Sequence, residues 1–448
     1  MKRKDFIHHA AMAAAGSMLL PLANCKTTPM VIRKNWAGNY QYQAKNLYTP
    51  QTVEETQSLV KKLSTQKALG SCHCFNDIAD SPLNQISTAN LNKLVSLDST
   101  GRSVTVESGV RYGQFAPELD HLGFALHNLA SLPHISVAGA ASTATHGSGV
   151  TNGNLATAVK AFEFISADGA LHQLSKEKDG EKFNAMVVGL GAFGIITKVT
   201  LQVEPTYRVR QDLYQDLPLS SLQEHFDEIM SSGYSVSLFT DWQNKAISQV
   251  WIKRKVESDT KDLGLDFFGA RAATKNLHPI TRLSSENCTE QMGVAGTWYE
   301  RLPHFKMGFT PSSGEELQAE FFVPRKNAVD AIIALEKKGD LIYPQLMITE
   351  IRTIAADDLW MSTAYQQDSV AIHFTLKQNI PEVMALLPII TAELAPFGVR
   401  PHWGKLFTVD PKSLHARYPK YDEFLALVKE YDPKGKFRNK YLDLNIYG

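Results

Sequence analysis

The 448-residue sequence has no net charge and few cysteines, and both absences exclude classes of protein. Its 46 basic and 46 acidic residues cancel, so no long-range field attracts nucleic acid or an anionic membrane. Basic clusters interleaved with aromatic residues are absent, which sets nucleic-acid binding aside. The four cysteines are too few for a disulfide framework. The sequence contains no internal repeat, and its length predicts two domains with terminal extensions.

The N-terminal segment differs from the rest in composition. "MKRKDF" is a cationic start, and the apolar run after it is too short to span a bilayer comfortably. This pattern predicts an export signal over residues 1–30. Arg3 and Lys4 resemble a twin-arginine signal, and "LANC", ending at Cys25, resembles a lipoprotein processing box; a plain secretory signal is the alternative. We expect an exported protein, either periplasmic or anchored to a membrane by a lipid at Cys25.

Local patterns predict the elements that follow. Thr52 and Glu55 have the spacing of a capping box, which begins a helix. Two short strands are expected around a turn at Gly101, then a short helix that ends at Gly123. A hairpin is expected to turn at Gly169.

The stretch "GLGAFG", residues 189–194, matches the dinucleotide pattern G-x-G-x-x-G. That fingerprint requires a helix after the glycines, inside a βαβ unit. Residues 195–203 instead alternate apolar and polar side chains, which is typical of a strand. We therefore predict a close-approach turn here rather than a Rossmann site.

Residues 128–153 are dense in Gly, Ala, Ser and Thr and lack periodicity over most of their length. Small residues allow backbone amides to approach a ligand closely. A flexible linker is the alternative, but the segment also contains apolar residues and His134 and His146, which linkers rarely have. The composition favours a bound ligand.

The triplet Cys72-His73-Cys74 follows a Gly-Ser turn and raises the possibility of a metal site. Three consecutive side chains do not easily converge on one tetrahedral ion, and no second Cys/His pair follows at zinc spacing. A Cys-x-Cys redox pair would close a small, strained ring. By default, a lone histidine in a turn is solvated or hydrogen-bonded.

From residue 207 onward the chain has long mixed segments, which indicate a second domain up to residue 404. Three segments there place polar residues where they can share a face of a sheet. A solvated sheet face is the alternative for any one segment, but three together favour a pocket for a polyhydroxylated ligand. The polar residues are Glu350, Arg352, His373, Thr375, His402 and Lys405.

Together these segments resemble the vanillyl-alcohol-oxidase superfamily of FAD enzymes and, more narrowly, the bacterial alditol (xylitol/sorbitol) oxidases. The resemblance runs over nearly all of the mature chain, from "NWAGNYQYQAKNLYTP" to "DPKGKFRN". Its specific blocks are "ASLPHISVAG", "ATHGSGV", "YSVSLFTDW", "ERLPHF", "FTPSSG", "EIRT" and "RPHWGKLFTV".

The resemblance implies an α+β fold with a two-part FAD-binding domain of the vanillyl-alcohol-oxidase (PCMH) type and a cap domain built on a large antiparallel sheet. The expected parts are the FAD-binding domain at 31–206, the cap at 207–404, and a tail at 405–448 that returns to the FAD-binding domain.

The resemblance also assigns residues, with His73 expected to be bonded covalently to FAD. The expected cofactor-binding residues are Gly70, Ser71, Cys72, His73, Cys74, Phe75, Asn76, Ser131, Ser136, Gly139, Thr143, Thr145, His146, Ile196 and His402. The expected substrate-binding residues are Ser131, Glu350, Arg352, His373, Thr375 and Lys405, of which Glu350, Arg352 and Lys405 are expected to be catalytic. No metal is expected.

The activity implied is oxidation of the terminal hydroxyl of a polyol, such as xylitol or sorbitol, to the aldose. The hydride passes to FAD, and dioxygen reoxidises the flavin to give hydrogen peroxide. A sugar-1,4-lactone oxidase or dehydrogenase of the same superfamily is one alternative, since those enzymes share a Glu-x-Arg pair. A non-catalytic carbohydrate-binding lipoprotein is another. We expect a monomer whose partners are the polyol and dioxygen.

One departure from the family pattern concerns the turn around His73. The family usually has Gly before this histidine and Ser after it, whereas this chain has Cys72 and Cys74. If the backbone at Cys72 is left-handed, its side chain costs on the order of 1–2 kcal/mol.

Overall fold

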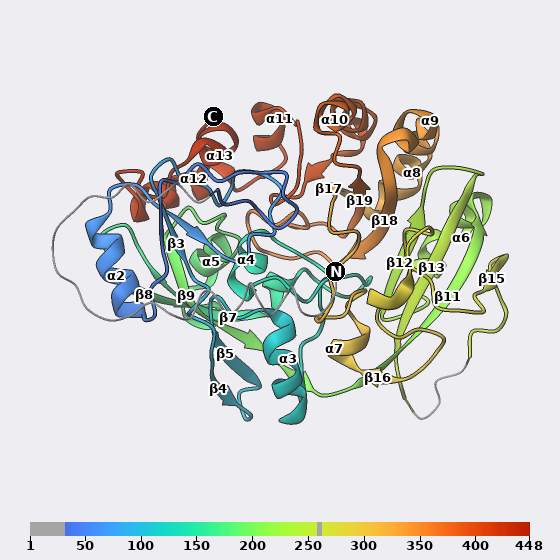
Figure 1. Cartoon of the computed structure of the whole chain (residues 1–448), viewed down its shortest axis with the longest axis horizontal. Coiled ribbons are helices and arrows are strands. Elements are labelled where there is room, and N and C mark those ends of the chain that lie inside the picture. The colour runs from blue at the N-terminus through green and yellow to red at the C-terminus, as the bar shows by residue number, and fades with distance from the viewer. Residues whose placement is uncertain (1–31, 258–261) are drawn as a thin grey trace. The chain divides into compact units, whose positions relative to one another are not determined.

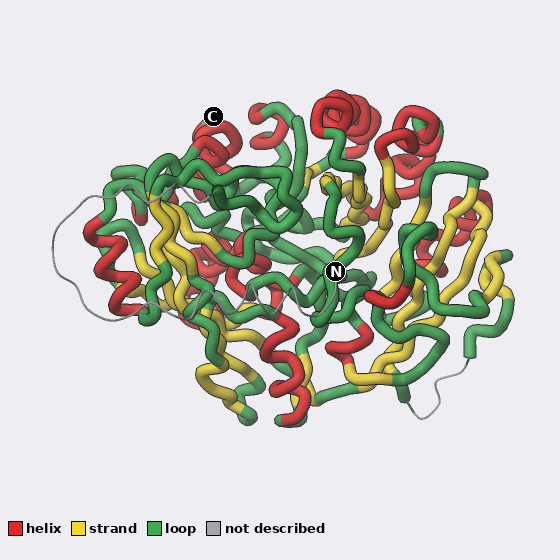
Figure 2. Tube along the Cα trace, viewed as in Figure 1, coloured by secondary structure: helices red, strands yellow, loops and turns green. Residues whose placement is uncertain are grey.

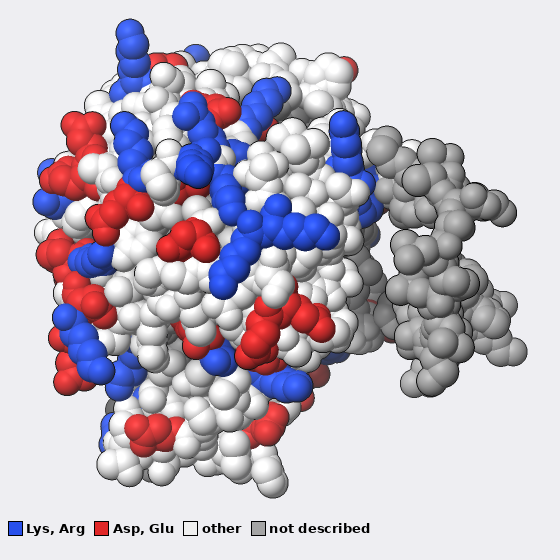
Figure 3. Space-filling view, turned by 90° about the vertical axis from the view of Figure 1, so that its left-hand side faces the viewer, with Lys and Arg blue, Asp and Glu red and all other residues white. Residues whose placement is uncertain are grey.

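The computed structural model describes residues 32–257 and 262–448 (Figure 1). The predicted export signal and Cys25 lie outside the described residues. The strands gather on two sides of the molecule, with helices along the outside (Figure 2), so the expected α+β class is confirmed. Acidic and basic side chains are interspersed over the face drawn in Figure 3, in keeping with the balanced charge of the sequence.

A small parallel sheet begins the described chain, in the order β1-β3-β2. Its strands are β1 (Asn46–Tyr48), β2 (Lys67–Leu69) and β3 (Asn84–Ser87). The predicted helix is α2 (Val53–Lys62), and the Thr52 hydroxyl accepts a hydrogen bond from the amide of Glu55, as a cap should. The turn that contains His73 leaves directly from the end of β2.

A five-stranded antiparallel sheet follows, in the order β4-β5-β9-β7-β8. Its strands are β4 (Leu94–Asp98), β5 (Ser103–Glu107), β7 (Val159–Ile165), β8 (Leu171–Ser175) and β9 (Ile195–Gln202), and its helices are α3 (Tyr112–His121), α4 (Val137–Ser142) and α5 (Lys176–Val187). The two expected strands, the short helix and the hairpin are confirmed as β4, β5, α3 and β7–β8. The short helix α4 was not expected, because six residues are too few to show a period.

The glycine-rich turn before β9 is not a dinucleotide fingerprint, as predicted. A strand follows it, not a helix. At Gly194, where φ is 148°, a Cβ atom would lie 2.1 Å from the carbonyl oxygen of Ile165. The glycine is therefore required for the close approach of two backbones.

The larger sheet contains ten of the described strands, in the order β14-β15-β11-β13-β12-β18-β19-β17-β20, with β16 beside β11. All of its pairs are antiparallel. The strands are β11 (Arg208–Pro218), β12 (Ser235–Thr240), β13 (Ala246–Lys255), β14 (Asp266–Phe267), β15 (Ala270–Ala272), β16 (Gly296–Thr297), β17 (Leu317–Pro324), β18 (Leu346–Ile354), β19 (Ser369–Leu376) and β20 (Arg400–Pro401). The expected large antiparallel sheet is confirmed.

The two faces of this sheet differ in character. Helices α6 (Leu219–Met230), α8 (Ala328–Glu336) and α10 (Ile380–Leu394) pack on one face, over a core that includes Leu238 and Ile351. Residues at the alternate positions, such as Glu350, point to the opposite face. Residues 380–397 are long and apolar enough to cross a membrane by composition, but the helix buries Val383, Leu386, Leu387, Ile390 and Leu394 in that core.

The C-terminal tail contains α11 (Pro411–His415), α12 (Tyr421–Tyr431) and α13 (Lys440–Leu442). Phe424 of α12 packs edge-on against Phe193, with ring centroids 5.2 Å apart. The same hydrophobic cluster also includes Trp298, so it crosses the predicted boundary at residue 206. The domain limits therefore stay predictions. Strand β6 (Phe124–Ala125) pairs with β10 (Glu204–Pro205). Two further short helices are α7 (Trp298–Arg301) and α9 (Gly339–Ile342).

Candidate active site

A cavity with about 1910 Å³ of empty space, its mouth included, lies against the polar face of the large sheet, the turn around His73 and the small-residue stretch. Its lining joins the turn around His73, the small-residue stretch and the polar face of the sheet, so one cavity offers groups to both a cofactor and a substrate. Every residue predicted to bind cofactor or substrate lines it, except Asn76. The Asn76 amide donates instead to the carbonyl oxygens of Trp403 and Lys405, at 2.8 Å each.

The small-residue stretch forms one wall of the cavity and offers hydroxyl groups to it. A Cβ atom at Gly139 would lie 2.8 Å from Ser136 Oγ, and one at Gly70 would lie 2.7 Å from the same atom. This hydroxyl is buried and has no hydrogen-bond partner among the described residues. Thr143 and Thr145, at the other end of α4, also line the cavity, and their hydroxyls are 3.0 Å apart. An unpartnered hydroxyl between two glycines fits a cofactor that approaches the backbone closely.

His73 lies in the cavity with neither ring nitrogen hydrogen-bonded to another described residue, and both are buried. Its ring stacks on Trp36, with centroids 5.6 Å apart. Burial, with the charges of His134 and Arg111 nearby, lowers the pKa of His73 to about 3. The imidazole is therefore neutral at physiological pH and has a nitrogen available for bonding.

The cysteines on either side of His73 are free thiols. Cys72 has a φ of 62°, so its backbone is left-handed at a position where the family usually has Gly. Burial raises the pKa of Cys74 to about 11, which keeps that thiol protonated. Neither cysteine forms a disulfide with the other.

On the large sheet, Glu320, His373 and Glu350 form a row across β17, β19 and β18. Glu320 pairs with His373 in register, and His373 pairs with Glu350. All three side chains are buried, with exposed fractions of 2%, 7% and 6%. Two carboxylates and an imidazole therefore face one small region of the cavity.

Arg352, two residues after Glu350 on β18, holds this row together. Its guanidinium donates to Glu320 at 2.8 Å and to the hydroxyl of Ser131 at 3.1 Å, and its Nε lies 3.5 Å from Glu350. Ser131 comes from the small-residue stretch, so Arg352 connects the two sides of the cavity. A charge-assisted pair of this kind is stronger than a neutral hydrogen bond.

The charges of the row follow from its contacts. Burial raises the pKa of Glu350, but Arg352 and His304 outweigh it, so the carboxyl titrates well below its usual range. The same balance, with His146 and Arg352 as the partners, lowers the pKa of Glu320. Burial lowers the pKa of His373 to about 3. At neutral pH the row therefore presents two carboxylates and a neutral imidazole.

Lys405 and Thr375 line the next part of the cavity. Gln318 pairs with Thr375 in register, and the Lys405 ammonium donates to the side-chain oxygen of Gln318. The same ammonium lies 4.8 Å from the centre of the Phe75 ring. Burial lowers the pKa of Lys405. This part of the cavity supplies donors that complement the acceptors of the row.

His146 and His402 lie behind the row and hold Glu320 in place. His146 Nε2 is 3.1 Å from Glu320 Oε1, and the backbone amide of His402 donates to the carbonyl oxygen of Glu320 at 2.9 Å. Both imidazoles line the cavity. The structure thus brings the predicted substrate residues together in one cavity, where their individual roles remain predictions.

Sequence reasoning missed several polar residues of this site. Gln318 and Glu320 alternate in "EELQAEFF", which is the same signal that identified Glu350 and Arg352. The sequence signal for His304 is its place in the family block "ERLPHF". Lys253 alternates with Trp251 in "QVWIKRK", and both side chains are buried. The alternation is therefore present on two further strands, β13 and β17, whereas His304 lies in a loop.

Comparison with known families agrees with this geometry. An FAD binding domain family matches residues 44–175, and a D-arabinono-1,4-lactone oxidase family matches residues 311–445. The chain is 43% identical over 412 residues to the alditol oxidase of a Streptomyces species, covering 91% of this chain and 97% of that one. It is 27% identical over 434 residues to the L-gulono-1,4-lactone dehydrogenase of Mycobacterium tuberculosis, covering 92% of this chain and 98% of that one.

Among solved structures, cholesterol oxidase from B. sterolicum has a similar fold. The TM-score is 0.74 at 14% sequence identity, and the match covers 96% of this chain and 100% of that one. At this identity the likeness shows the fold alone. The expected PCMH-type FAD-binding architecture with a large antiparallel sheet is thereby confirmed.

Proposed function

The chain belongs to the alditol oxidase family of FAD-dependent oxidoreductases, and from this we propose that it oxidises the terminal hydroxyl of a polyol such as xylitol or sorbitol. The alcohol carbon loses a hydride and its hydroxyl loses a proton, giving the aldose. Dioxygen takes up two electrons and two protons and leaves as hydrogen peroxide. The observation that carries the proposal is the buried row of Glu320, His373 and Glu350, which Arg352 crosses. Together these side chains offer several fixed hydrogen-bond partners to adjacent substrate hydroxyls.

Bound FAD supplies the hydride acceptor for this oxidation. The residues that would hold it are those of the small-residue wall, with Ser136 and Thr143, and the turn around His73. The chain's own side chains orient the substrate and move its proton. The Glu350 carboxylate accepts hydrogen bonds from substrate hydroxyls. Arg352 and Lys405 supply positive charge that stabilises a developing alkoxide.

The hydroxyl proton needs an acceptor in the cavity. His373 is neutral because burial lowers its pKa to about 3, so a ring nitrogen is open to the proton, although a pKa this low makes the imidazole a weak base. Deprotonation assisted by the Lys405 and Arg352 charges alone is the other route. The variant His373→Phe distinguishes them at matched flavin content: it mainly lowers kcat if the imidazole is the base, and mainly raises KM if the imidazole only contacts the substrate.

We propose further that FAD is attached covalently through His73. Its unpartnered ring nitrogens, buried in the cavity, support this attachment. Acid precipitation of purified protein should leave yellow flavin in the pellet for the wild type and in the supernatant for His73→Ala. Flavin still bonded to that variant would refute the assignment.

Substrate assays test the reaction itself. Purified protein should form peroxide with xylitol, sorbitol or mannitol, and Glu350→Gln should keep its flavin but lose most turnover. The lactone oxidase family match over residues 311–445 favours a second candidate, oxidation of a sugar-1,4-lactone. Turnover of gulonolactone without turnover of any polyol would establish that candidate instead. A non-catalytic carbohydrate-binding role is set aside, because the chain belongs to an enzyme family.

Export and lipid attachment at Cys25 are proposed on the sequence alone. Cell fractionation tests them. A lipid-anchored protein appears in the membrane fraction, and Cys25→Ala should release it to a soluble fraction. An uncleaved protein in the cytoplasm would contradict export.

A further inference from the structure

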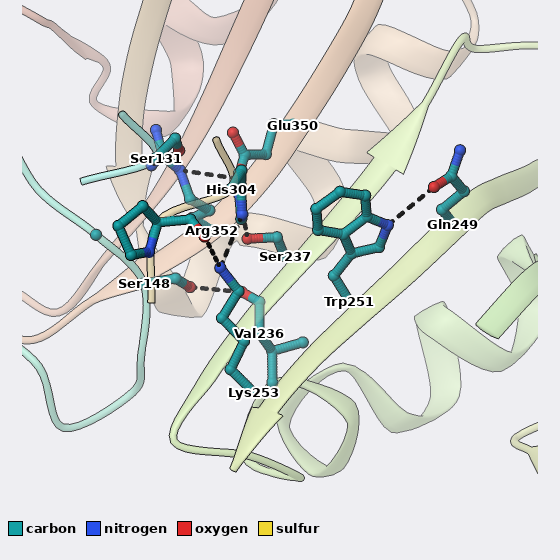
Figure 4. A network of polar contacts seen from close by, with 12 residues as sticks. Ser131, Ser148, Val236, Ser237, Gln249, Trp251, Lys253, His304, Glu350 and Arg352 are labelled. Atoms are coloured by element: carbon teal, nitrogen blue, oxygen red, sulfur yellow. Dashed lines mark hydrogen bonds and ion pairs between the residues drawn. The ribbon is translucent and has the colours of Figure 1, made fainter. Parts of the chain in front are cut away.

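Behind Glu350 lies a chain of polar contacts that the proposed reaction does not use (Figure 4). His304 Nε2 is 2.7 Å from Glu350 Oε1, and His304 Nδ1 is 2.9 Å from Lys253 Nζ. Glu350 and His304 line the cavity. Lys253 lies on β13, with β12 between its strand and the β18 strand of Glu350. The polar contacts therefore connect Lys253 on the sheet, through His304 in the loop before β17, to the substrate-binding carboxylate of Glu350.

The hydrogen-bond donors of Lys253 determine which nitrogen of His304 carries the hydrogen. An ammonium has three N–H donors and no acceptor. Lys253 contacts the carbonyl oxygens of Leu302 and Pro303, the latter at 3.1 Å, and its third contact is His304 Nδ1. Nδ1 must then accept, so the hydrogen of a neutral ring lies on Nε2 and is donated to Glu350.

Packing fixes the plane of the His304 ring independently of these bonds. Trp251 meets the ring edge-on at 5.1 Å and Phe239 at 5.7 Å between centroids. The indole of Trp251 is itself held by Gln249, at 2.8 Å. The backbone amide of His304 donates to the carbonyl oxygen of Ser131 at 2.8 Å, which ties the loop to the opposite wall of the cavity.

The charges of the neighbours agree with this arrangement. Burial lowers the pKa of His304 to about 4, with Lys253 adding to the effect, so the ring is neutral. Burial also lowers the pKa of Lys253 to about 7, so the ammonium form predominates below that pH. The other charged or titratable groups around the pair are Arg352 on β18, His373 on β19 and Cys288 in the loop before β16.

We propose that Lys253 and His304 are positioning residues for Glu350. Lys253 fixes the tautomer of His304, and His304 holds the Glu350 carboxylate ionised and oriented toward the substrate hydroxyls. The inference rests on the proposed function for the role of Glu350 in binding. If Lys253 loses its proton, its lone pair faces Nδ1, the hydrogen moves there, and the bare Nε2 faces a carboxylate. The productive state therefore requires a protonated Lys253.

Steady-state kinetics on the FAD-loaded enzyme test the pair. Lys253→Met and His304→Leu should each lower kcat/KM for xylitol roughly 10- to 100-fold, mainly through KM, because each weakens a buried charged hydrogen bond. His304→Gln keeps an amide N–H near the position of Nε2 and should recover most of that loss. In the His304→Leu background, Lys253→Met should have no further effect, since Lys253 acts through His304.

The pH profile separates positioning from packing. In the wild type, kcat/KM should fall as pH rises through the pKa of Lys253, and this limb should be absent in Lys253→Met. Parallel profiles, additive losses in the double variant, or equal losses in His304→Gln and His304→Leu would each overturn the proposal. Lys255→Met is the matched control, because Lys255 lies on the same strand but pairs with Glu204 at 2.8 Å, and its turnover should be unchanged.

A measurement independent of turnover keeps this inference separate from the proposed function. Below the pKa of Lys253, ¹⁵N-labelled imidazole NMR should show the hydrogen of His304 on Nε2 in the wild type and redistributed in Lys253→Met. A hydrogen on Nδ1 in the wild type would overturn the proposal whatever the substrate is. If the wild type oxidises a lactone and no polyol, the proposed function fails, and the same kinetic comparison is made with the lactone.

Discussion

Cys72 occupies a backbone conformation that disfavours any side chain with a Cβ atom. Its φ of 62° is in the left-handed region, which costs about 1–2 kcal/mol for such a residue. Cys72→Gly removes this strain but adds about 0.4–1 kcal/mol of unfolded-chain entropy. We therefore expect the variant to be more stable by roughly 0.5–1 kcal/mol, measured as the free energy of unfolding in urea at matched flavin content.

Cys74→Gly is the matched control two residues away. Cys74 has no positive φ and packs against the hydrophobic core, so glycine there removes contacts and relieves no strain. It should lower stability by on the order of 1 kcal/mol. Equal effects of the two substitutions would show that the backbone at Cys72 is not strained.

At the same scale, the residues that sequence reasoning could predict are those with a local signal. Glu350 and Arg352 alternate on one strand, so their common face follows from the period of a strand. Glu320 carries the same signal, in alternation with Gln318. Lys253 and His304 meet only because a loop returns to a strand some fifty positions earlier, and no local pattern encodes that contact. Asn76 belongs to the correct loop, but its side chain faces away from the cavity.

At the scale of elements, the side chain of Asn439 connects the tail to the turn that follows His73. Asn439 Nδ2 donates to the carbonyl oxygens of Asp77, Ile78 and Asp80, at 3.0, 3.1 and 2.8 Å. Its side-chain oxygen also caps α13 by accepting from the amide of Leu442. Asn439→Ala leaves buried carbonyls without a donor, so we expect a loss of about 1–3 kcal/mol in the free energy of unfolding.

The variant Asn439→Asp separates the contribution of the three amide hydrogen bonds to the turn from that of the helix cap. The carboxylate preserves the cap acceptor but faces three carbonyl oxygens without a donor. It should therefore be less stable than Asn439→Ala, measured by the urea midpoint of the flavin-loaded protein. If Asp were better tolerated than Ala, the cap would be the main contribution and the tail would not be fastened through this amide.

Elements with local signals were predicted from the sequence, and their long-range order was not. The capping pattern at Thr52 predicted α2, and the apolar alternation after Gly194 predicted β9. The order of the large sheet places β18 between β12 and β19, which pairs Glu350 with Phe239 on one side and His373 on the other. Pairings across more than a hundred residues depend on the whole packed core, so only the family resemblance anticipated this sheet.

At the scale of the molecule, the described chain buries several histidines in their neutral form. Burial lowers the pKa of His73, His373 and His402 to about 3, and of His278 and His304 to about 4. An unfolded histidine titrates near 6.5. Below that pH, each of these side chains therefore takes up a proton when the protein unfolds. Stability should therefore fall as pH drops from about 6.5 toward 4. Burial raises the pKa of Asp357 to about 6, which opposes this trend, and it also raises the pKa of Asp77 and Asp432.

His278 allows this acid sensitivity to be tested away from the flavin. Its Nδ1 accepts from the amide of Ile280 at 3.0 Å, and an asparagine oxygen can replace that acceptor without titrating. Between pH 7 and 5, His278→Asn should lose about 2 kcal/mol less stability than the wild type, from one pKa lowered through that interval. Asp357→Asn should increase the loss of stability in acid, because it removes one of the groups that oppose the histidines. The check is urea unfolding of the flavin-loaded proteins at both pH values; an unchanged acid loss in His278→Asn would mean that this imidazole is not held neutral by burial.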